Sequence, residues 1–496
     1  MNILMAASEV APYAKTGGLA DVVGSLPKAL AALGHRVSVI MPRYPMVERA
    51  VRSLEKVHAG LDVPMGSHAE RGVIWTAKLT PQIPVYFVEH RGFFERDSLY
   101  TTASGDYPDN AQRFTFFAKI VLEACRALTL QPDLIHCHDW QAALIPAYLK
   151  TTLSHDPTTA RIGSLLTIHN IAYQGLFPPD VLEFLGLPPE TYSLDGIEFY
   201  GRVNFLKAGI VYADLINTVS QRYSQEIQTP DFGAGLDGIL SYRAQDVSGI
   251  LNGVDYDEWN PATDRLIAAR YTSMDLSGKQ ACKRDLLQTL QLSPELLNAP
   301  LIGMISRLVD QKGMDLLRSV IHRLLSLDLG LVVLGVGEAH YERFLQEVAE
   351  RYPAKVGVRI GFDNTLAHKI EAGSDIFCMP SRFEPCGLNQ IYSLKYGTIP
   401  LVRSTGGLDD TIEPYDPGLA RGNGFKFGPY DAEALLAALQ EAVLLYRNRP
   451  AWEQLMHRAM QADFSWTKSA QVYTELYTRA LAKRRGAPAF SPSTHS

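Results

Sequence analysis

Short apolar runs alternate along the chain with segments whose apolar residues have helical spacing. In the first half the runs predict strands at residues 2–7, 37–41, 85–88, 134–137, 165–168 and 215–218. The segments between them predict helices at 20–33, 110–128 and 142–149. Strands that alternate with helices are typical of a parallel sheet with helices on its faces.

The alternation starts again after a polar stretch at 257–298. Strands are predicted at 301–305, 331–334, 358–360, 376–379 and 398–402, and helices at 314–327, 341–351 and 366–372. A chain of 496 residues also exceeds what one core usually covers. We therefore expect two α/β domains, at 1–252 and 253–464. A helix at 465–485 is expected to pack back on the first domain, and 486–496 are expected to form a disordered tail.

Composition narrows the class of protein. With 46% hydrophobic and 20% charged residues, the chain is typical of a globular enzyme, and a net charge of −6 without a basic tract argues against a nucleic-acid partner. Five widely spaced cysteines indicate reduced thiols rather than a disulfide framework. There is no apolar run long enough to span a membrane and no targeting segment at the N-terminus. We expect a cytoplasmic protein without a membrane partner, and the sequence does not indicate its oligomeric state.

The segment from Ile376 to Thr411 carries the most specific chemistry. Its first strand leads into a turn with Glu384 and then to Gly387 at the start of a helix. Its second strand leads into the turn 404–407, Ser-Thr-Gly-Gly, and another helix. Two helix N-termini at one edge of a parallel sheet offer N–H groups and positive dipole ends to an anion such as a diphosphate. A phosphate cradle beside one carboxylate predicts transfer of a group from a nucleotide.

Two cations are expected at the same edge of that sheet. Arg307 and Lys312 flank the turn after strand 301–305. Arg presents a planar fork of donors and Lys a point charge, a combination common around phosphates. Taken alone, they are also ordinary surface charges near a turn. Their position at the carboxyl end of a strand, like the two glycine turns, favours the phosphate interpretation.

A glycine-rich loop follows the first strand of the chain. Lys15, Gly17 and Gly18 lie between strand 2–7 and helix 20–33, at an edge where open α/β sheets bind ligands. The spacing is not that of a Walker A box. The loop is either a tight strand-to-helix turn or part of a ligand site, and the spacing alone does not decide between the two.

Polar residues also follow strands 134–137 and 165–168. His136 and His138 are two residues apart on a strand, so they face the same way and in principle suit a metal. A buried, hydrogen-bonded histidine is commoner, and no further ligand pattern accompanies them. Asp139 and His169, at adjacent strand ends, are better candidates to bind sugar hydroxyls as acceptor and donor.

Two further motifs lack the context that their chemistry needs. Residues 233–238 match G-x-G-x-x-G, but they do not follow a strand, as the dinucleotide fingerprint requires. Asp255 and Asp257 resemble the paired aspartates with which some sugar transferases hold a metal, but they lie in a turn-rich linker. We expect no obligatory metal.

Nine motifs, in order along nearly the whole chain, resemble the family of bacterial glycogen synthases and plant starch synthases. They are KTGGLADVVGSLPKAL, YPDNAQRFTFFAKIVLEA, HCHDW, TIHNIAYQG, NFLKAGIVYADLINTVS, FGAGLDGIL, NGVDYDEWNP, SRLVDQKG and RFEPCGLNQIYSLKYGTIPLVRSTGGL. The absence of a transit segment favours the bacterial glycogen branch over a plastid precursor.

The resemblance implies a GT-B architecture, two Rossmann-like domains that face each other across a cleft. It implies transfer of glucose from ADP-glucose to the non-reducing 4-OH of an α-1,4-glucan, with retention of configuration and without a metal or other cofactor. Glu384 matches the family's essential acid, with Asp139 and His169 as further residues of the catalytic site. The donor phosphates would be bound by residues of both domains: Lys15, Gly17, Gly18, Arg307, Lys312, Cys386, Gly387, Leu388, Thr405 and Gly406. Asn170 and Asn252 would hold the sugar.

Two positions depart from related sequences. Tyr392 stands where many sugar transferases carry a second Glu, which fits the starch and glycogen branch. Phe362 stands at the base-binding position, where the family tends to have Tyr; its ring can stack on a base but offers no hydroxyl. The alternatives are a GT-B transferase that uses UDP-glucose or forms a disaccharide, a glucan phosphorylase, and an inactive glucan-binding scaffold.

Overall fold

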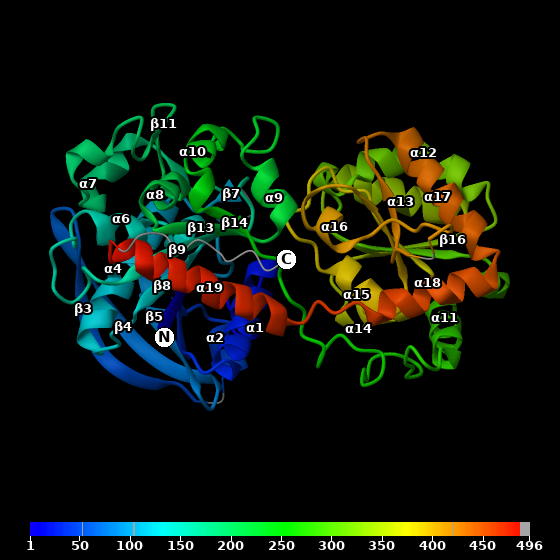
Figure 1. The fold of residues 1–496 in the computed structure, drawn as a ribbon, viewed down its shortest axis with the longest axis horizontal. Helices are drawn as coiled ribbons and strands as arrows, with labels where there is room; N and C mark the ends of the chain where they lie inside the picture. Colours follow the sequence, from blue (N-terminus) through cyan, green and yellow to red (C-terminus); the bar gives the residue numbers. More distant parts are fainter. Residues whose placement is uncertain (52, 103–104, 420, 487–496) are drawn as a thin grey trace. The chain divides into compact units, whose positions relative to one another are not determined.

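The computed structural model describes residues 1–51, 53–102, 105–419 and 421–486. Internal contacts divide the chain into two compact units, which Figure 1 shows in sequence colours. The first unit contains Met1–Val219, Ser224–Gly253 and the chain from Trp466 onward. The second contains Val254–Ser465 together with the short segment Ser220–Tyr223. Apart from Gly486, the tail expected at 486–496 lies outside the described residues.

The first unit is built on a nine-stranded sheet. Its spatial order is β14 (Val247–Gly249), β13 (Leu215–Thr218), β9 (Gly163–Ile168), β8 (Leu134–His138), β1 (Asn2–Ala6), β2 (Arg36–Pro42), β5 (Ile83–Glu89), β4 (His68–Thr80) and β3 (Glu55–Met65). The strands from β14 to β5 run parallel, and β4 pairs antiparallel with both β5 and β3. The strand order reverses between β1 and β8, the point at which doubly wound sheets bind ligands.

Helices surround this sheet, and two small sheets extend it. The helices are α1 (Gly18–Ala32), α2 (Val47–Ala50), α3 (Arg91–Phe94), α4 (Asn110–Ala127), α5 (Asp139–Ala142), α6 (Leu144–Lys150), α7 (Leu182–Leu185), α8 (Phe205–Tyr212), α9 (Gln221–Glu226), α10 (Asp237–Tyr242) and α19 (Trp466–Arg484). The small sheets are β6 (Thr101–Thr102) with β7 (Gly105–Asp106), and β10 (Leu176–Phe177), β12 (Arg202–Asn204) and β11 (Glu198–Phe199).

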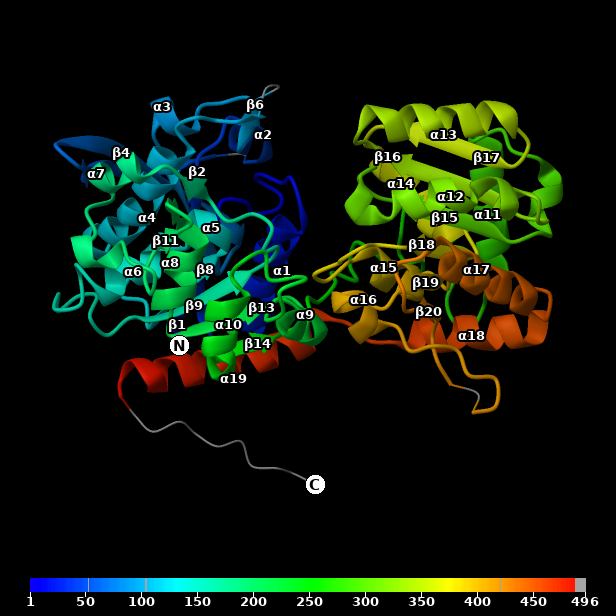
Figure 2. The same cartoon turned by 90° about the horizontal axis from the view of Figure 1, so that it is seen from above.

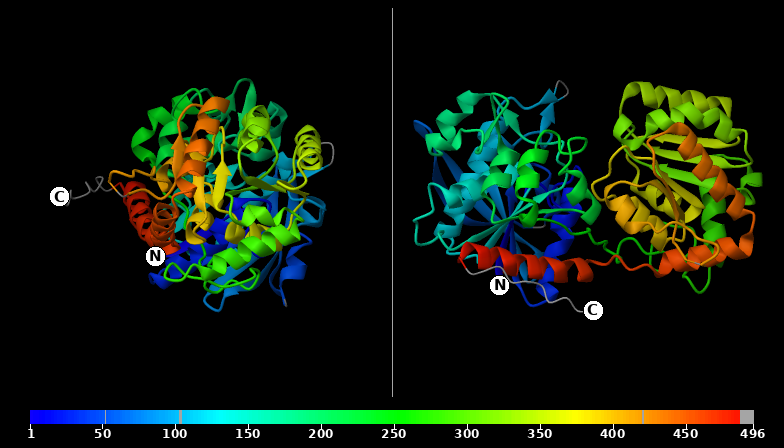
Figure 3. Two further views of the ribbon diagram at one scale, coloured as in Figure 1. Left: turned by 90° about the vertical axis from the view of Figure 1, so that its right-hand side faces the viewer. Right: turned by 45° about the horizontal axis from the view of Figure 1, so that its top comes forward.

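The C-terminal helix α19 completes the first unit. It packs on α1, β9 and β13, and the right-hand panel of Figure 3 shows it in red along one face of the sheet. Its apolar side, Ala470, Tyr473, Leu476, Tyr477 and Ala480, is buried. Burial of this stripe is what fixes the helix here, because an isolated helix of this length is only marginally stable in water.

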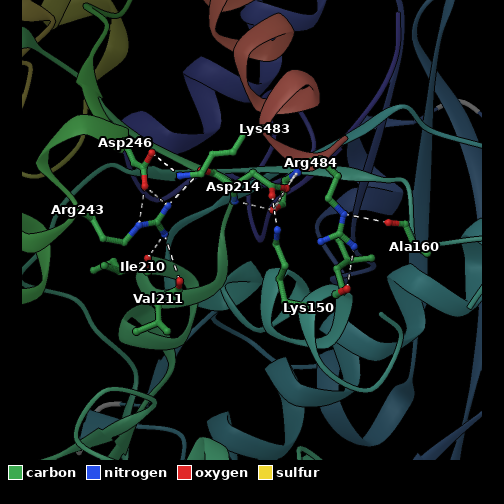
Figure 4. A network of polar contacts seen from close by, with 11 residues as sticks. Lys150, Ala160, Ile210, Val211, Asp214, Arg243, Asp246, Lys483 and Arg484 are labelled. Atoms are coloured by element: carbon green, nitrogen blue, oxygen red, sulfur yellow. Dashed lines mark hydrogen bonds and ion pairs between the residues drawn. The ribbon is translucent and has the colours of Figure 1, made fainter. Parts of the chain in front are cut away.

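Polar contacts hold the far end of α19 in place (Figure 4). Lys483 pairs with Asp246, which also accepts from Arg243 at 2.7 Å. Arg484 donates to the carbonyl oxygens of Ala160 and Leu149 at 3.0 and 2.9 Å. These contacts attach the last turn of α19 to segments that lie more than 200 residues earlier in the sequence.

The second unit has a six-stranded, fully parallel sheet. Its order is β17 (Val356–Ile360), β16 (Gly330–Gly335), β15 (Leu301–Ile305), β18 (Ile376–Met379), β19 (Ile399–Arg403) and β20 (Phe425–Phe427). In chain order this is 3-2-1-4-5-6, the order of dinucleotide-binding sheets, and it reverses between β15 and β18. The helices are α11 (Ser277–Thr289), α12 (Met314–Leu325), α13 (Ala339–Arg351), α14 (Asn364–Gly373), α15 (Asn389–Lys395), α16 (Gly406–Thr411), α17 (Ala432–Tyr446) and α18 (Arg449–Gln461).

The apolar runs of this sheet serve two cores at once. Along β16, Leu331 and Val333 face α12, α13 and α17, whereas Val332 and Leu334 face α11 and α14. A strand covered on both faces needs apolar residues at every position, and for this reason it reads as a continuous run. Figure 2 shows these strands side by side with helices around them.

The segment Ser220–Tyr223 leaves the first unit and joins the second. The hydroxyl of Ser220 donates to the carbonyl oxygen of Pro385 at 2.6 Å, and the N–H of Arg222 donates to Asp410 at 2.9 Å. A single boundary after Asn252, as expected from the sequence, leaves Ser220–Tyr223 in the first unit. The sequence does not reveal the true placement of this segment, because the segment is held by long-range hydrogen bonds rather than marked by a local pattern.

All five cysteines are buried, and none of them forms a disulfide. Within the described ranges, the helices are all too short or too polar to cross a membrane.

Candidate functional site

Three loops meet where the strand order of the second unit reverses. The first follows β15 and carries Arg307 and Lys312, the second follows β18 and carries Glu384, and the third follows β19 and carries Thr405 and Gly406. Parallel strands end at one edge, so residues from distant parts of the sequence converge there. The predicted phosphate-binding residues of this half therefore lie on adjoining loops.

Glu384 is the buried acid of this edge. It is 6% exposed, and its Oε2 accepts from Lys312 Nζ at 2.5 Å and from the Ser381 hydroxyl at 3.0 Å. Arg307 donates to Gln311 at 3.0 Å. A carboxylate is costly to bury unless a cation and hydrogen bonds accompany it, and Lys312 and Ser381 supply both. Ser381 and Gln311 are absent from the sequence-based site, because neither belongs to a pattern of its own.

Glycines allow the turns around Glu384 to touch through their backbones. A Cβ on Gly406 would lie 1.9 Å from the Glu384 carbonyl oxygen, and one on Gly407 would lie 2.1 Å from that of Cys386. The Gly407 N–H donates to the Glu384 carbonyl at 3.1 Å. Next to Lys312, a Cβ on Gly313 would lie 2.2 Å from the Pro380 carbonyl. Packing accounts for these glycines, and it fixes Glu384 relative to Lys312.

The helix starts at this edge are weaker than the sequence suggests. The helix expected from Gly387 begins at Asn389, and Gly387 itself has φ +71°. α15 has seven residues and α16 has six, so their dipoles are small. Arg307 and Lys312 accordingly supply positive charge that these short helices do not, and the backbone from Cys386 to Leu388 adds N–H groups.

Two aromatic side chains of the second unit, Phe362 and Tyr392, have contrasting environments. Phe362, between β17 and α14, is 94% exposed, so its ring is available for stacking. Tyr392 lies 4.1 Å from Trp259, ring centroid to centroid, and Trp259 stacks on His368 at 3.9 Å on its other face. The residue that replaces the second Glu of other sugar transferases thus fills a three-ring stack.

Glu9 organises the glycine-rich loop of the first unit. Its carboxylate accepts from the N–H groups of Thr16 and Gly17 at 2.5 and 3.2 Å and from the hydroxyls of Thr16 and Tyr100 at 2.6 Å each. Lys15 pairs with Asp21 at 2.6 Å, and its side chain is exposed. Sequence analysis missed Glu9; its signal is an acid at the end of a buried strand, beside the reversal of strand order.

Gly17 and Gly18 have no packing reason to be glycine. A Cβ at either position would meet nothing within 4 Å, and Gly17 has an extended backbone, φ −156°. The first N–H groups of α1, from Gly18 onward, have no partner within the helix. Open space over free N–H groups fits close approach of a ligand to the backbone.

Asp139 holds the loop after β9 in place. It has the positive φ of +55°, uncommon outside glycine, and its Oδ1 accepts from the His169 N–H at 2.7 Å. Burial raises the pKa of Asp139 to about 7, while hydrogen bonds from the backbones of His169 and Asn170 act in the opposite direction. This carboxylate is therefore engaged with the backbone that carries His169, in addition to the sugar contact expected from the sequence.

The remaining first-unit candidates differ in their surroundings. Asn170 is partly exposed, and its Oδ1 accepts from the Ala172 N–H at 3.0 Å. Asn252 is 5% exposed, and its buried Oδ1 has no hydrogen-bond partner in the part of the chain that the structure describes. A buried amide oxygen without a partner is rare and fits a group that a ligand satisfies.

His136 is not a metal ligand. Both ring nitrogens are hydrogen-bonded, Nδ1 to the Tyr477 hydroxyl at 2.9 Å and Nε2 to the Thr167 hydroxyl at 2.6 Å. Nδ1 of His138 faces Nε2 of His169 at 3.0 Å. His136 and His138 do face the same way, with ring centroids 4.1 Å apart. They lie in the core, however, where ring nitrogens of both bind protein groups.

The two motifs without context are turns. Gly235 has φ +82° and adjoins the ring of Phe199, in a loop that precedes α10 rather than following a strand. Asp255 Oδ1 accepts from the N–H of Asp257 at 3.0 Å, a turn stabilised by its own side chain. Among the residues with described positions, no group of three or more His, Cys, Asp and Glu is placed to hold a metal ion.

Lys15 and Glu384 belong to different units, each with its own reversal of strand order and its own set of candidate residues. Residues 2–242 match a family model described as the starch synthase catalytic domain, and residues 292–455 match one described as glycosyl transferases group 1.

Full-length relatives and solved structures agree with these matches. The chain is 48% identical over 493 residues to a glycogen synthase of Koribacter versatilis, covering 98% of this chain and 100% of that one. It is 47% identical over 494 residues to glycogen synthase 1 of Geobacter metallireducens, covering 99% and 98%. The catalytic domain of starch synthase IV from Arabidopsis thaliana, bound to ADP and acarbose, superposes with a TM-score of 0.89 at 35% identity, covering 97% of this chain and 99% of that one.

A sucrose-phosphate synthase from Thermosynechococcus elongatus, at 16% identity and a TM-score of 0.58 over 97% of this chain and 99% of that one, shares the fold alone. The predicted GT-B fold and the resemblance seen in the nine motifs are confirmed. The chain belongs to the glycogen and starch synthase family of retaining glycosyltransferases.

Proposed function

We propose that this chain is a glycogen synthase that transfers glucose from ADP-glucose to the non-reducing 4-OH of an α-1,4-glucan, with retention of configuration. The observation that carries the proposal is the buried Glu384, paired with Lys312 at the sheet edge where such folds bind nucleotides. Full-length similarity to glycogen synthases, and to a starch synthase solved with ADP, supports the same donor.

The diphosphate is the natural partner of Arg307 and Lys312. Lys312 Nζ is 2.5 Å from Glu384, so a phosphate that approaches this cation also comes close to the carboxylate. Positive charge at this point stabilises the negative charge that develops on ADP as the bond to glucose breaks. The backbone of Cys386, Gly387 and Leu388, and the turn at Thr405 and Gly406, would contribute N–H groups.

The chemical step breaks one C–O bond and makes another. The bond from the glucosyl C1 to the β-phosphate oxygen breaks, and C1 bonds to the acceptor O4 on the same face of the sugar. The proton of the acceptor hydroxyl passes to the departing phosphate. Glu384 stabilises positive charge on the sugar during this step, a role that one carboxylate can fill. A double displacement would need a second carboxylate as nucleophile or base.

The first unit supplies contacts to the sugar and to the donor. His169, Asn170 and Asn252 would bind hydroxyls, and the unpartnered Oδ1 of Asn252 would accept from one of them. Lys15 and the open backbone at Gly17 and Gly18 would border the donor. Asp139 acts on the same site through the backbone N–H of His169.

The proposal includes no metal and no cofactor, because Arg307, Lys312 and backbone N–H groups supply the positive charge. Phe362 would stack on the base. The cytoplasm is the proposed location, which five buried cysteines without a disulfide support.

A donor competition tests the proposal. The purified full chain is given glycogen primer with labelled ADP-glucose or labelled UDP-glucose, and label in the polysaccharide is measured. We expect incorporation from ADP-glucose, with kcat/KM at least tenfold above that for UDP-glucose. A preference for UDP-glucose would favour the alternative, a transferase that uses UDP-glucose. No incorporation from either donor would favour an inactive glucan-binding protein.

A further inference from the structure

A cluster of three histidines in the first unit ends at the ring of His169. Nε2 of His169 lies 3.0 Å from Nδ1 of His138, whose ring lies against that of His136, with centroids 4.1 Å apart. His136 is hydrogen-bonded in turn to Thr167 and Tyr477. His136, His138 and Thr167 are fully buried, whereas His169 is partly exposed. The cluster therefore runs from the core under α19, through one ring contact and one hydrogen bond, to a candidate site residue.

The hydrogen-bond donors around His136 determine which of its ring nitrogens carries the proton. Asn217 Nδ2 donates to the Thr218 carbonyl at 2.8 Å, so its Oδ1 is the atom that accepts from the Thr167 hydroxyl at 2.8 Å. The hydroxyl proton of Thr167 is thereby used, and His136 Nε2 must donate to Thr167 at 2.6 Å. His136 Nδ1 then accepts from the Tyr477 hydroxyl at 2.9 Å. Burial lowers the pKa of His136 to about 3, which agrees with this neutral form.

The burial of His138 determines which of its ring nitrogens carries the proton. Its Nε2 is buried and has no hydrogen-bond partner among the described residues. A proton on Nε2 would leave an orphaned N–H in the interior, which is rarer in folded proteins than an unpaired acceptor. The proton therefore lies on Nδ1 and is donated to His169 Nε2. Nε2 of His169 accepts this hydrogen bond and so carries no proton, which leaves the ring's own proton on Nδ1. The pKa of His169, lowered by burial to about 3, agrees with a neutral ring.

We propose that His138 is a positioning residue that holds His169 as the Nδ1–H tautomer, so that His169 offers a hydrogen-bond donor to an oxygen of the substrate's sugar. In the described chain no hydrogen bond occupies His169 Nδ1; the ring is bonded through Nε2, and the backbone N–H through Asp139. Sugar hydroxyl and ring oxygens accept from such an N–H. The part that concerns the sugar rests on the proposed function, whereas the tautomer does not.

The tautomer is read directly by nitrogen NMR of the full chain labelled with ¹⁵N-histidine. The ring signals of His169 are assigned from their loss in His169→Gln. We expect a protonated, pyrrole-type Nδ1 and an unprotonated, pyridine-type Nε2 for His169. The reverse assignment would overturn the proposal.

Two substitutions separate donation from packing. His138→Asn keeps an N–H donor near the place of Nδ1, whereas His138→Leu fills the space without one. We expect His138→Leu to lower kcat about tenfold, the loss of about one hydrogen bond, with unchanged Kd for ADP. We also expect the Nε2–H form of His169 to appear in its spectrum, and His138→Asn to restore most of the rate. Equal losses in both variants, or an unchanged kcat in His138→Leu, would overturn the proposal.

The outcomes remain distinguishable if one arm fails. Should His138→Leu not fold, the wild-type spectrum and His138→Asn still decide. If the wild-type chain transfers no glucose, the proposed function fails, while the spectrum of His169 tests the positioning by His138 independently.

Discussion

Gly406 sets the distance between two turns that surround Glu384. In Gly406→Ala the new Cβ would lie 1.9 Å from the Glu384 carbonyl oxygen, where ordinary contact begins at 3.4 Å. The turn that carries Glu384 must therefore move by about 1.5 Å, and the φ of +45° at Gly406 adds backbone strain. Misplacement of a catalytic group by about 1 Å costs about 100-fold in rate. We expect kcat for glucose transfer to glycogen to fall about 100-fold.

Gly428→Ala is the matched control in the same unit. A Cβ there meets nothing within 4 Å, so we expect wild-type kcat. Thermal unfolding of both variants measures the accompanying strain, which we expect to cost about 1–3 kcal/mol in Gly406→Ala only. Wild-type kcat in Gly406→Ala would refute the reasoning, since it would show that Glu384 does not depend on the contact between the two turns.

Four further predictions concern single side chains. Glu384→Gln should lower kcat by about 1000-fold or more while ADP still binds in calorimetry, because the charge acts on the sugar; lost ADP binding would remove its chemical role. Lys312→Ala and Arg307→Ala should each raise KM for the donor and lower kcat, and unchanged kinetics in both would remove the phosphate assignment. The pKa of Asp139 is raised by burial to about 7 from 3.8, so its contribution to stability is lost as the pH rises between these values, by at most about 1.4 kcal/mol per unit. The Tm of Asp139→Asn relative to wild type should therefore rise from pH 5 to pH 8, and a constant difference would contradict this pKa. Phe362→Ala should weaken ADP binding about fivefold without a change in Tm, and Phe362→Tyr should not weaken it; equal affinity in all three proteins would remove the stacking role.

Most of the parallel strands could be predicted to within about two residues at each end, whereas the short edge strands β14 and β20 were missed. β15 and β18 have the expected bounds, Leu301–Ile305 and Ile376–Met379, because a strand covered on both faces is apolar throughout. The long hairpin of β3 and β4 was missed. Its positions are mostly exposed or half-buried, with bulges between Lys56 and His58 and between His58 and Leu61, so no clean alternation marks it.

The site residues likewise fall into those that a local motif reveals and those that depend on the fold. Glu384 and Lys312 were found because each belongs to a local motif, and the structure adds that they form an ion pair. Glu9 and His138 act through partners that the fold brings together, Thr16 across a loop and His169 on the neighbouring strand end. No local pattern reports such partners, because the contacts exist only once the sheet has formed.

The linkage and anomeric form of the product test the central claim most directly. The full chain is incubated with ADP-glucose and maltotriose, and the product is examined by proton NMR. We predict maltotetraose with a new α-1,4 linkage at the non-reducing end and one equivalent of ADP. A β-linked product, or free glucose without chain extension, would contradict the account in which Glu384 and the departing phosphate direct glucose to a glucan 4-OH.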